Sequence, residues 1–222
     1  MTKVLVTGFD AFGTTPVNPA GSVARKLDGM TINGATVIAK IAPAAFFKSI
    51  EYVKEVIADV QPDVVIMLGE YGGRSMITVE RIANNFNDAT RYQLVDNEGC
   101  ALQDQPTDPE GPVGYYTTLP IRAMVKAMRA AGIPADISDT PGTFVCNHLM
   151  YGILHHIATE NLNIRAGWIH LPHLPSVAAM ECHLGAPSMS EETAVAGMTA
   201  GIEAILEHTE DIHDPIRSLW QI

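Results

Sequence analysis

The chain has 222 residues, 47% of them hydrophobic and 18% charged, which excludes intrinsic disorder because disordered chains combine low hydrophobicity with high charge. Its 14 basic and 25 acidic residues give a formal net charge of −11. A surface of that sign repels nucleic-acid phosphates and anionic lipids, so neither nucleic acids nor membranes are expected partners. The length suits a single domain over residues 1–222.

Short apolar runs alternate with stretches of helical periodicity along the chain. Runs rich in β-branched residues predict buried strands at Lys3–Gly8, Thr36–Ile41, Asp63–Leu68 and Ala166–Leu171. A further strand is predicted over Ile77–Ala83 from its high β propensity. Strands that alternate with helices predict an α/β fold, here a three-layer α/β/α sandwich with a mostly parallel central sheet.

The helices are predicted from apolar residues at steps of three and four. One such pattern runs from Phe46 to Val60, and another begins at Ile121 and stops at Gly132. A third follows Ser188, which is expected to form a capping box with Glu191.

The segment from Asn87 to about Thr118 is dense in Asp, Asn, Gln, Pro and Gly. A loop this long inside a compact domain is usually functional or disordered. Ligands of open α/β sheets bind at the carboxyl ends of the strands, so this segment is predicted to be a lid over that edge.

Several common motifs are absent from the sequence. It contains no dinucleotide fingerprint, P-loop, nucleophile elbow or HExxH zinc motif, and the glycines of Gly69–Arg74 are more typical of a tight turn than of a phosphate site. No CxxC or HxxxH spacing indicates a metal site. The three cysteines, Cys100, Cys146 and Cys182, predict free thiols in a reducing compartment. With no secretory signal or long apolar run, the predicted location is the cytoplasm.

Cys146 is the most suggestive of the three thiols. It follows a turn and begins a predicted helix, where free backbone N–H groups and the helix dipole favour a thiolate and could hold an oxyanion. The alternative is that Cys146 is the top of a buried stripe with Met150, Ile153 and Ile157. His148 is turned about 200° away from Cys146 on the same helix, so it is a poor base for that thiol.

A thiol nucleophile needs an imidazole base, and the imidazole needs an orienting partner. His170 lies at the carboxyl end of a predicted strand, where α/β enzymes place catalytic groups, although it could equally be a core histidine. Glu80 lies in an apolar strand and would need a partner if buried, and an imidazole would supply one. The alternative is a solvent-exposed position for Glu80 at a sheet edge.

Several blocks of sequence resemble the pyroglutamyl peptidase I family of cysteine peptidases. They are VTGFDAFG with the following Asn18-Pro19, the segment from Gly69 through Arg81, DNEG at 96–99, GTFVCN at 142–147 and GWIHLP at 167–172. The blocks occur in the family's order and span nearly the whole chain, which makes the resemblance specific.

The resemblance implies that Cys146 is the nucleophile, His170 the base and Glu80 the third member of a triad. It also implies an oxyanion site made by backbone amides near Cys146 together with the Arg74 region. The expected reaction is hydrolysis of the bond after an N-terminal pyroglutamate through an acyl-enzyme, with pyroglutamyl peptides as substrates and no cofactor or metal.

The substrate pocket implied by the resemblance contains Phe9, Phe12, Asn18, Glu70 and Phe144, and relatives suggest a homo-oligomer, a tetramer. Three positions depart from the family pattern: Glu70 replaces a usual Gln or other uncharged residue, Ala11 a usual Pro and His173 a usual Tyr. Two alternatives stay open, a nucleoside-phosphorylase-like enzyme and a catalytically silent small-molecule binder on a similar fold.

Overall fold

The structure is a computed structural model that describes residues 1–219. Its centre is a seven-stranded sheet in the order β2-β3-β1-β4-β9-β5-β8. These strands are β1 (Lys3–Phe9), β2 (Thr31–Ile32), β3 (Ala35–Ala42), β4 (Val64–Glu70), β5 (Ile77–Glu80), β8 (Ala135–Ser138) and β9 (Arg165–Leu171). Neighbouring strands are parallel except β2 with β3 and β5 with β9. The predicted mostly parallel sheet is therefore confirmed.

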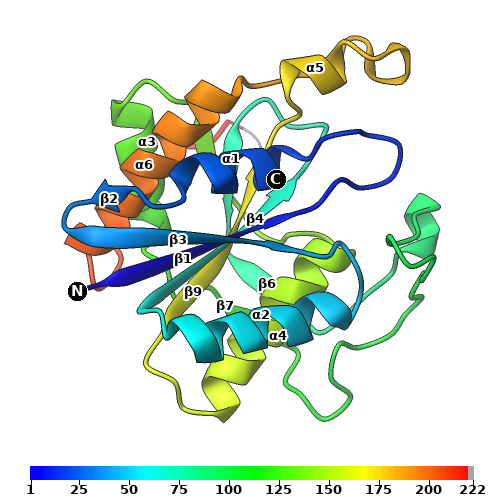
Figure 1. Cartoon of the computed structure of the whole chain (residues 1–222), viewed down its shortest axis with the longest axis horizontal. Coiled ribbons are helices and arrows are strands. Elements are labelled where there is room, and N and C mark those ends of the chain that lie inside the picture. The colour runs from blue at the N-terminus through cyan, green and yellow to red at the C-terminus, as the bar shows by residue number, and fades with distance from the viewer. Residues whose placement is uncertain (220–222) are drawn as a thin grey trace.

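Helices cover both faces of this sheet, as Figure 1 shows. The helices on one face are α1 (Pro19–Leu27), α3 (Ile121–Ala130) and α6 (Glu191–Glu207), and those on the other are α2 (Lys48–Val60) and α4 (Val145–Thr159). Each helix layer buries its own apolar cluster against the sheet. The three-layer α/β/α sandwich is confirmed.

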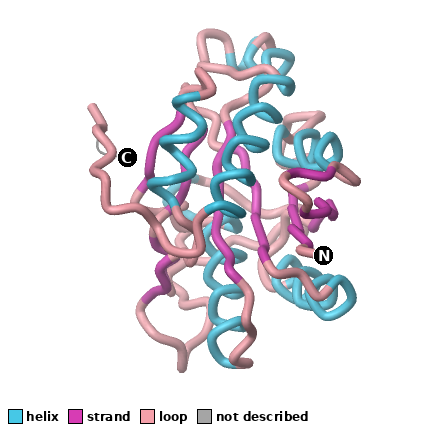
Figure 2. Tube along the Cα trace, turned by 90° about the vertical axis from the view of Figure 1, so that its left-hand side faces the viewer, coloured by secondary structure: helices cyan, strands magenta, loops and turns pink. Residues whose placement is uncertain are grey.

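The remaining elements are short. They are α5 (Pro175–Ala178), two 3₁₀ turns at Thr90–Tyr92 and Glu181–His183, and a hairpin of β6 (Ile82–Asn84) with β7 (Gly114–Tyr116). After α6, residues 208–219 form no helix or strand and run along the outside of the molecule (Figure 2). No helix among the described residues is long and apolar enough to cross a membrane.

Two local predictions need correction. The strand expected over Ile77–Ala83 is broken at Arg81, because β5 stays in the central sheet while β6 leaves it to pair with β7. The helix α6 is capped by Ser190, whose Oγ accepts a hydrogen bond from the Thr193 N–H at 3.1 Å, and not by Ser188. The backbone of Ser188 instead forms an isolated parallel β-bridge with that of His173.

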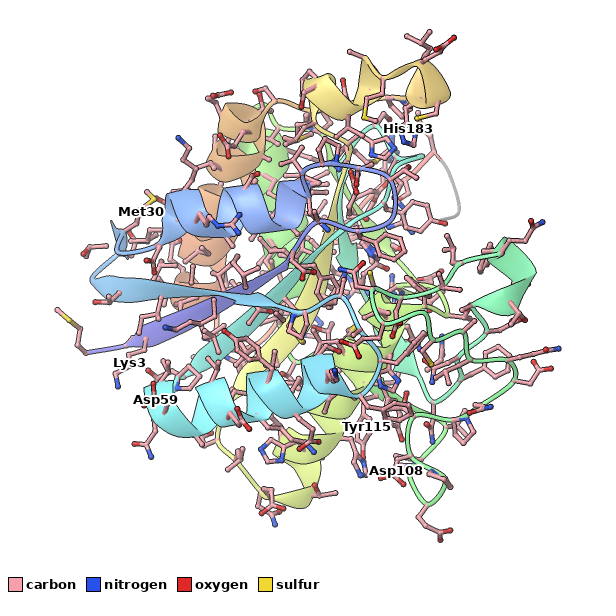
Figure 3. All side chains as sticks on the ribbon, turned by 45° about the vertical axis from the view of Figure 1, so that its right-hand side comes forward. Lys3, Met30, Asp59, Asp108, Tyr115 and His183 are labelled. Carbon is pink, nitrogen blue, oxygen red and sulfur yellow. The ribbon has the colours of Figure 1, made fainter. Side chains whose placement is uncertain are left out.

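The segment between Asn87 and Thr118 is more ordered than its composition indicates. Asn87 pairs with Gln105 in an isolated β-bridge, and Asn85 and Asn87 hold the backbone at Gln105, Asp108 and Gly111 through their side chains. The segment lies at the end of the molecule opposite Lys3 and Asp59, as the labelled Asp108 and Tyr115 show in Figure 3. Since Lys3 begins β1, this end carries the carboxyl ends of the parallel strands.

His148 is turned away from Cys146, as predicted, and joins three segments of the fold. Its Nε2 accepts a hydrogen bond from the Phe47 N–H at 2.9 Å, so Nδ1 carries the proton and donates to Thr107 Oγ1 at 3.0 Å. The side chain is fully buried, and this burial lowers its pKa from 6.5 to about 4.

This depressed pKa predicts acid sensitivity. The pKa of His148 is 6.5 in the unfolded chain and about 4 in the folded chain, so between these values the unfolded chain binds a proton that the folded chain does not. The stability that neutral His148 contributes is therefore lost as the pH falls from about 6.5 to about 4. The expected loss is about 3 kcal/mol. Urea unfolding at pH 7 and pH 4.5 measures it, and His148→Gln, which keeps an acceptor for Phe47, should show a smaller difference. An equal difference in both proteins would contradict the assignment.

Candidate active site

A pocket of about 280 Å³ opens at the carboxyl end of the sheet. It is lined by residues of β1, β4, β9 and the start of α4, and by Tyr92 and Leu94 of the predicted lid segment. The residues predicted from the sequence that meet here are Phe9, Phe12, Asn18, Glu70, Phe144, Cys146 and His170. The structure thus brings together residues that are as far apart as 161 positions (170 − 9) in the sequence.

Cys146 is in the first turn of α4, which Phe144 precedes as the N-cap residue. The residue as a whole is half-buried, and the absence of a side chain at Gly69 leaves room for its sulfur. Burial, together with the carboxylates of Glu80 and Glu70, raises the pKa of the Cys146 thiol against the opposing effects of the helix backbone and Arg74. The predicted helix start is confirmed, and burial opposes the thiolate that this position was expected to favour.

His170 and Glu80 form a buried pair next to this pocket. Their exposed fractions are 1% and 0%, and His170 Nδ1 lies 2.8 Å from Glu80 Oε1. A carboxylate can only accept, so Nδ1 carries the proton and Nε2 is left free as an acceptor. Burial lowers the pKa of His170, although the hydrogen bond to Glu80 opposes the shift. A neutral imidazole in this tautomer is the form that a general base requires.

Arg74 contacts the same oxygen of Glu80 as His170 does. Its Nη1 is 2.6 Å from Glu80 Oε1 and also contacts Thr78 Oγ1, and its Nη2 donates to Ser138 Oγ at 3.1 Å. These contacts direct the guanidinium to the Glu80 carboxylate, and Arg74 does not line the pocket. Arg74 was predicted to contribute to the oxyanion site, but its side chain instead forms an ion pair with Glu80.

Aromatic side chains form the wall of the pocket. The ring of Phe144 lies 5.3 Å from those of Phe12 and Phe46, and Phe9 packs 5.5 Å from Trp168. Aromatic pairs at these separations are mutually favourable. Asn18 borders the pocket but uses its side chain on the backbone: it caps α1 at Ala20 and donates to the Asp10 carbonyl.

Two of the departures from the family pattern are partners of each other. Glu70 Oε1 lies 2.6 Å from His173 Nδ1, and burial raises the pKa of Glu70 although His173 opposes it. The His173 ring occupies the space where a side chain at Gly72 would stand, since a Cβ there would be 2.1 Å from His173 Nε2. The sequence indicated both positions but not their contact.

Some contributors to the site were missed at the sequence level. Tyr71 lines the pocket, stacks under the Arg74 guanidinium at 4.1 Å and packs edge-on against His170. Trp168 lies behind the site and is completely buried. Trp168 lies two residues before His170 in the same strand, so the two side chains share a face of the sheet. This spacing is the only signal in the sequence that could have placed Trp168 near the site. Within residues 1–219 there is no group of three or more His, Cys, Asp or Glu side chains that could hold a metal.

Comparison with known proteins places this arrangement in context. The sequence profile of the pyroglutamyl peptidase family matches residues 2–208. The chain is 62% identical over 222 residues, all of both chains, to a pyrrolidone-carboxylate peptidase of Mycobacterium marinum, and 63% identical over the same length to one of Mycobacterium tuberculosis.

Solved structures show the same similarity. The crystal structure of pyroglutamyl peptidase I from Bacillus amyloliquefaciens superposes with a TM-score of 0.92 at 37% identity, covering 96% of this chain and 99% of that one. A mutant pyrrolidone carboxyl peptidase from Pyrococcus furiosus gives a TM-score of 0.88 at 39% identity, covering 93% and 99%.

Proposed function

The chain belongs to the pyroglutamyl peptidase family of cysteine peptidases, and we propose that Cys146, His170 and Glu80 are the residues with which it removes an N-terminal pyroglutamyl group. The observation that carries this assignment is the buried Glu80–His170 hydrogen bond of 2.8 Å, which leaves Nε2 unprotonated in a pocket that also contains Cys146. Neither the phosphorylase-like enzyme nor the silent binder is favoured.

The first half of the reaction forms a thioester. His170 Nε2 takes the proton of the Cys146 thiol as the sulfur attacks the pyroglutamyl carbonyl carbon, and the carbonyl electrons move onto its oxygen. Because burial raises the pKa of the thiol and lowers that of the imidazole, the resting pair is neutral and the proton moves during the attack. His170 then gives this proton to the leaving amine.

The second half releases pyroglutamate. Water loses a proton to His170 Nε2 and attacks the thioester carbonyl, and the proton returns to the sulfur as the carbon–sulfur bond breaks. In both halves we assign the backbone N–H of Cys146 as a donor to the oxyanion. This assignment is supported by its position in the first turn of α4, where backbone amides have no intrahelical acceptor.

The pocket suits an uncharged ring. Its walls include Phe9, Phe12 and Phe144, and a flat lactam can pack between aromatic rings without leaving a charge desolvated. Two polar residues at the border of the pocket, Asn18 and Glu70, are proposed to recognise the ring amide. Asn18 acts indirectly, through the backbone at Asp10 that its side chain positions. Such a site rejects a protonated proline ring of nearly the same shape, since an ammonium would lose its hydration there.

This selectivity is the test of the proposed function. The fluorogenic amide of pyroglutamate should be hydrolysed with a kcat/KM on the order of 10³-fold or more above that of the matched prolyl amide. Iodoacetamide should abolish the activity, and adding phosphate should leave it unchanged. Comparable rates on the two amides would contradict the pocket assignment, and phosphate-dependent turnover of nucleosides would favour the phosphorylase-like alternative.

Three wider expectations stay predictions. The cytoplasm is supported by three cysteines that are all free thiols, as a nucleophilic sulfur requires, and fractionation of cells tests it. The homo-tetramer is tested by light scattering during size-exclusion chromatography. The single domain over residues 1–222 should unfold in one cooperative transition.

A further inference from the structure

Trp168 carries a buried hydrogen-bond donor that has no acceptor. Its side chain is 0% exposed, and its Nε1 makes no hydrogen bond among the described residues. Buried donors are nearly always paired, because leaving one without an acceptor costs free energy. Trp168 is two residues before His170 in β9, so the two side chains project from the same face of the strand, and their rings lie 5.6 Å apart.

The Cζ2–Cε2 edge of the indole and the Cys146 sulfur border the same space beside Gly69. A Cβ built on Gly69 would lie 2.5 Å from Trp168 Cζ2, 3.0 Å from its Cε2 and 3.1 Å from Cys146 Sγ. The sulfur and this ring edge therefore converge on the small space that Gly69 leaves empty. Cε2 is bonded to Nε1, so the N–H is one bond away from the ring atoms that border this space. Phe9 packs against the indole with ring centroids 5.5 Å apart and fixes it in this orientation.

The ionised sulfur has few donors. Burial and then the carboxylates of Glu80 and Glu70 raise the pKa of Cys146, and the hydrogen bond that opposes this shift comes from the Cys146 backbone. The guanidinium of Arg74 contacts Glu80 instead. A neutral thiol is a weak acceptor, whereas a thiolate is a strong one. The Trp168 N–H would thus gain its acceptor only when the sulfur loses its proton. Trp168 does not line the pocket, so the sulfur rather than the substrate is the reacting atom within its reach.

We propose that the Trp168 Nε1–H donates a hydrogen bond to the Cys146 sulfur as His170 takes the thiol proton, and thereby stabilises the attacking thiolate. The proton passes from Sγ to His170 Nε2, and Trp168 keeps its own. The proposal rests on the proposed function, since it assigns a role in activating the same nucleophile.

The first test removes the N–H and keeps the ring. Trp220→Phe leaves Trp168 as the only tryptophan, which can then be replaced biosynthetically by 3-benzothienylalanine, where sulfur stands in place of the N–H. Cys100→Ser and Cys182→Ser confine alkylation to Cys146. At a fixed pH below the thiol midpoint, alkylation by iodoacetamide should be about tenfold or more slower than in the tryptophan-containing parent. kcat for the pyroglutamyl amide should fall similarly, with KM nearly unchanged.

Equal alkylation rates and equal kcat in the two proteins would overturn the proposal, and would show that Trp168 acts by packing alone. Trp168→Phe provides the comparison, since it removes both the N–H and ring volume. Alkylation does not depend on the substrate, so it reports on Trp168 even if the proposed function fails. That failure would appear separately, as a parent protein unable to hydrolyse the amide.

The second test leaves Trp168 unchanged and so does not depend on whether a protein altered at Trp168 folds. With indole ¹⁵N labelling, the Trp220→Phe protein gives a single indole N–H resonance. This resonance should move over the pH range in which Cys146 becomes reactive, and it should stay fixed over that range in Cys146→Ala. A resonance that does not respond to ionisation of Cys146 would overturn the proposal.

Discussion

Replacing Cys146 with alanine is expected to abolish hydrolysis of pyroglutamyl amides, with kcat lower by about 10⁴-fold or more, since no other group can take the place of the attacking sulfur. The fold should be unaffected. Cys146 is half-buried in the first turn of α4, and its thiol is neutral at rest because its pKa is raised. The free energy of unfolding should therefore change by no more than about 1 kcal/mol, as measured by urea unfolding.

The other two thiols are matched controls for this substitution. Cys100 is half-buried and Cys182 is exposed, and neither lines the pocket. Cys100→Ala and Cys182→Ala should keep wild-type kcat/KM. An inactive Cys182→Ala protein beside an active Cys146→Ala protein would show that the nucleophile has been misassigned.

Glu80→Gln is expected to have the second largest effect, on activity and stability together. The carboxylate has 0% exposure and contacts both His170 and Arg74. A neutral amide cannot secure the Nδ1–H tautomer of His170 in the same way, and kcat/KM should fall by about 10³-fold or more. Removing one partner of a buried ion pair also leaves Arg74 uncompensated, so the free energy of unfolding should fall by about 3 kcal/mol or more.

The pH profile separates catalysis from stability in this variant. Activity requires a neutral His170, so kcat/KM rises with pH through the pKa of that imidazole, which burial places below the ordinary value of about 6.5. The Glu80 carboxylate raises this pKa, so its removal should move the acid limb to still lower pH.

Asp139→Asn is the control for Glu80→Gln, because it breaks the ion pair of the neighbouring Arg81 at a much more exposed position. It should change kcat/KM and stability little. An acid limb that moves to higher pH in Glu80→Gln would contradict the assigned partner of His170.

The central sheet and the candidate positions Cys146 and His170 could be predicted from local patterns, whereas the grouping of these two residues with Glu80 was implied by the family resemblance. Strands such as β1 and β4 are continuous apolar runs, and Cys146 and His170 stand at the ends of elements whose type the sequence indicates. The boundaries were less certain. Ser188 and Ser190 are both capping residues by type, and only the bridge from Ser188 to His173 decides between them.

The features that sequence patterns missed depend on contacts across the fold. Arg74 is only six residues from Glu80 in the sequence, but the sequence did not show that its side chain contacts this carboxylate. Arg74 is held there because it also contacts Thr78 and Ser138. The raised pKa of Cys146 is a second case. It follows from burial of the thiol in the assembled fold, an effect larger than that of the backbone at the helix start, which the sequence did indicate. Pairing of Glu70 with His173 likewise joins residues 103 positions apart.

The most direct test of the central claim is to trap the acyl-enzyme. Mixing the protein with a pyroglutamyl nitrophenyl ester, whose good leaving group makes acylation fast, should give a burst of nitrophenol close to one equivalent. After an acid quench, peptide mass spectrometry should find the pyroglutamyl group on Cys146, and Cys146→Ala should show neither burst nor adduct. A burst accompanied by the pyroglutamyl group on any other residue of the unmodified protein would contradict the account.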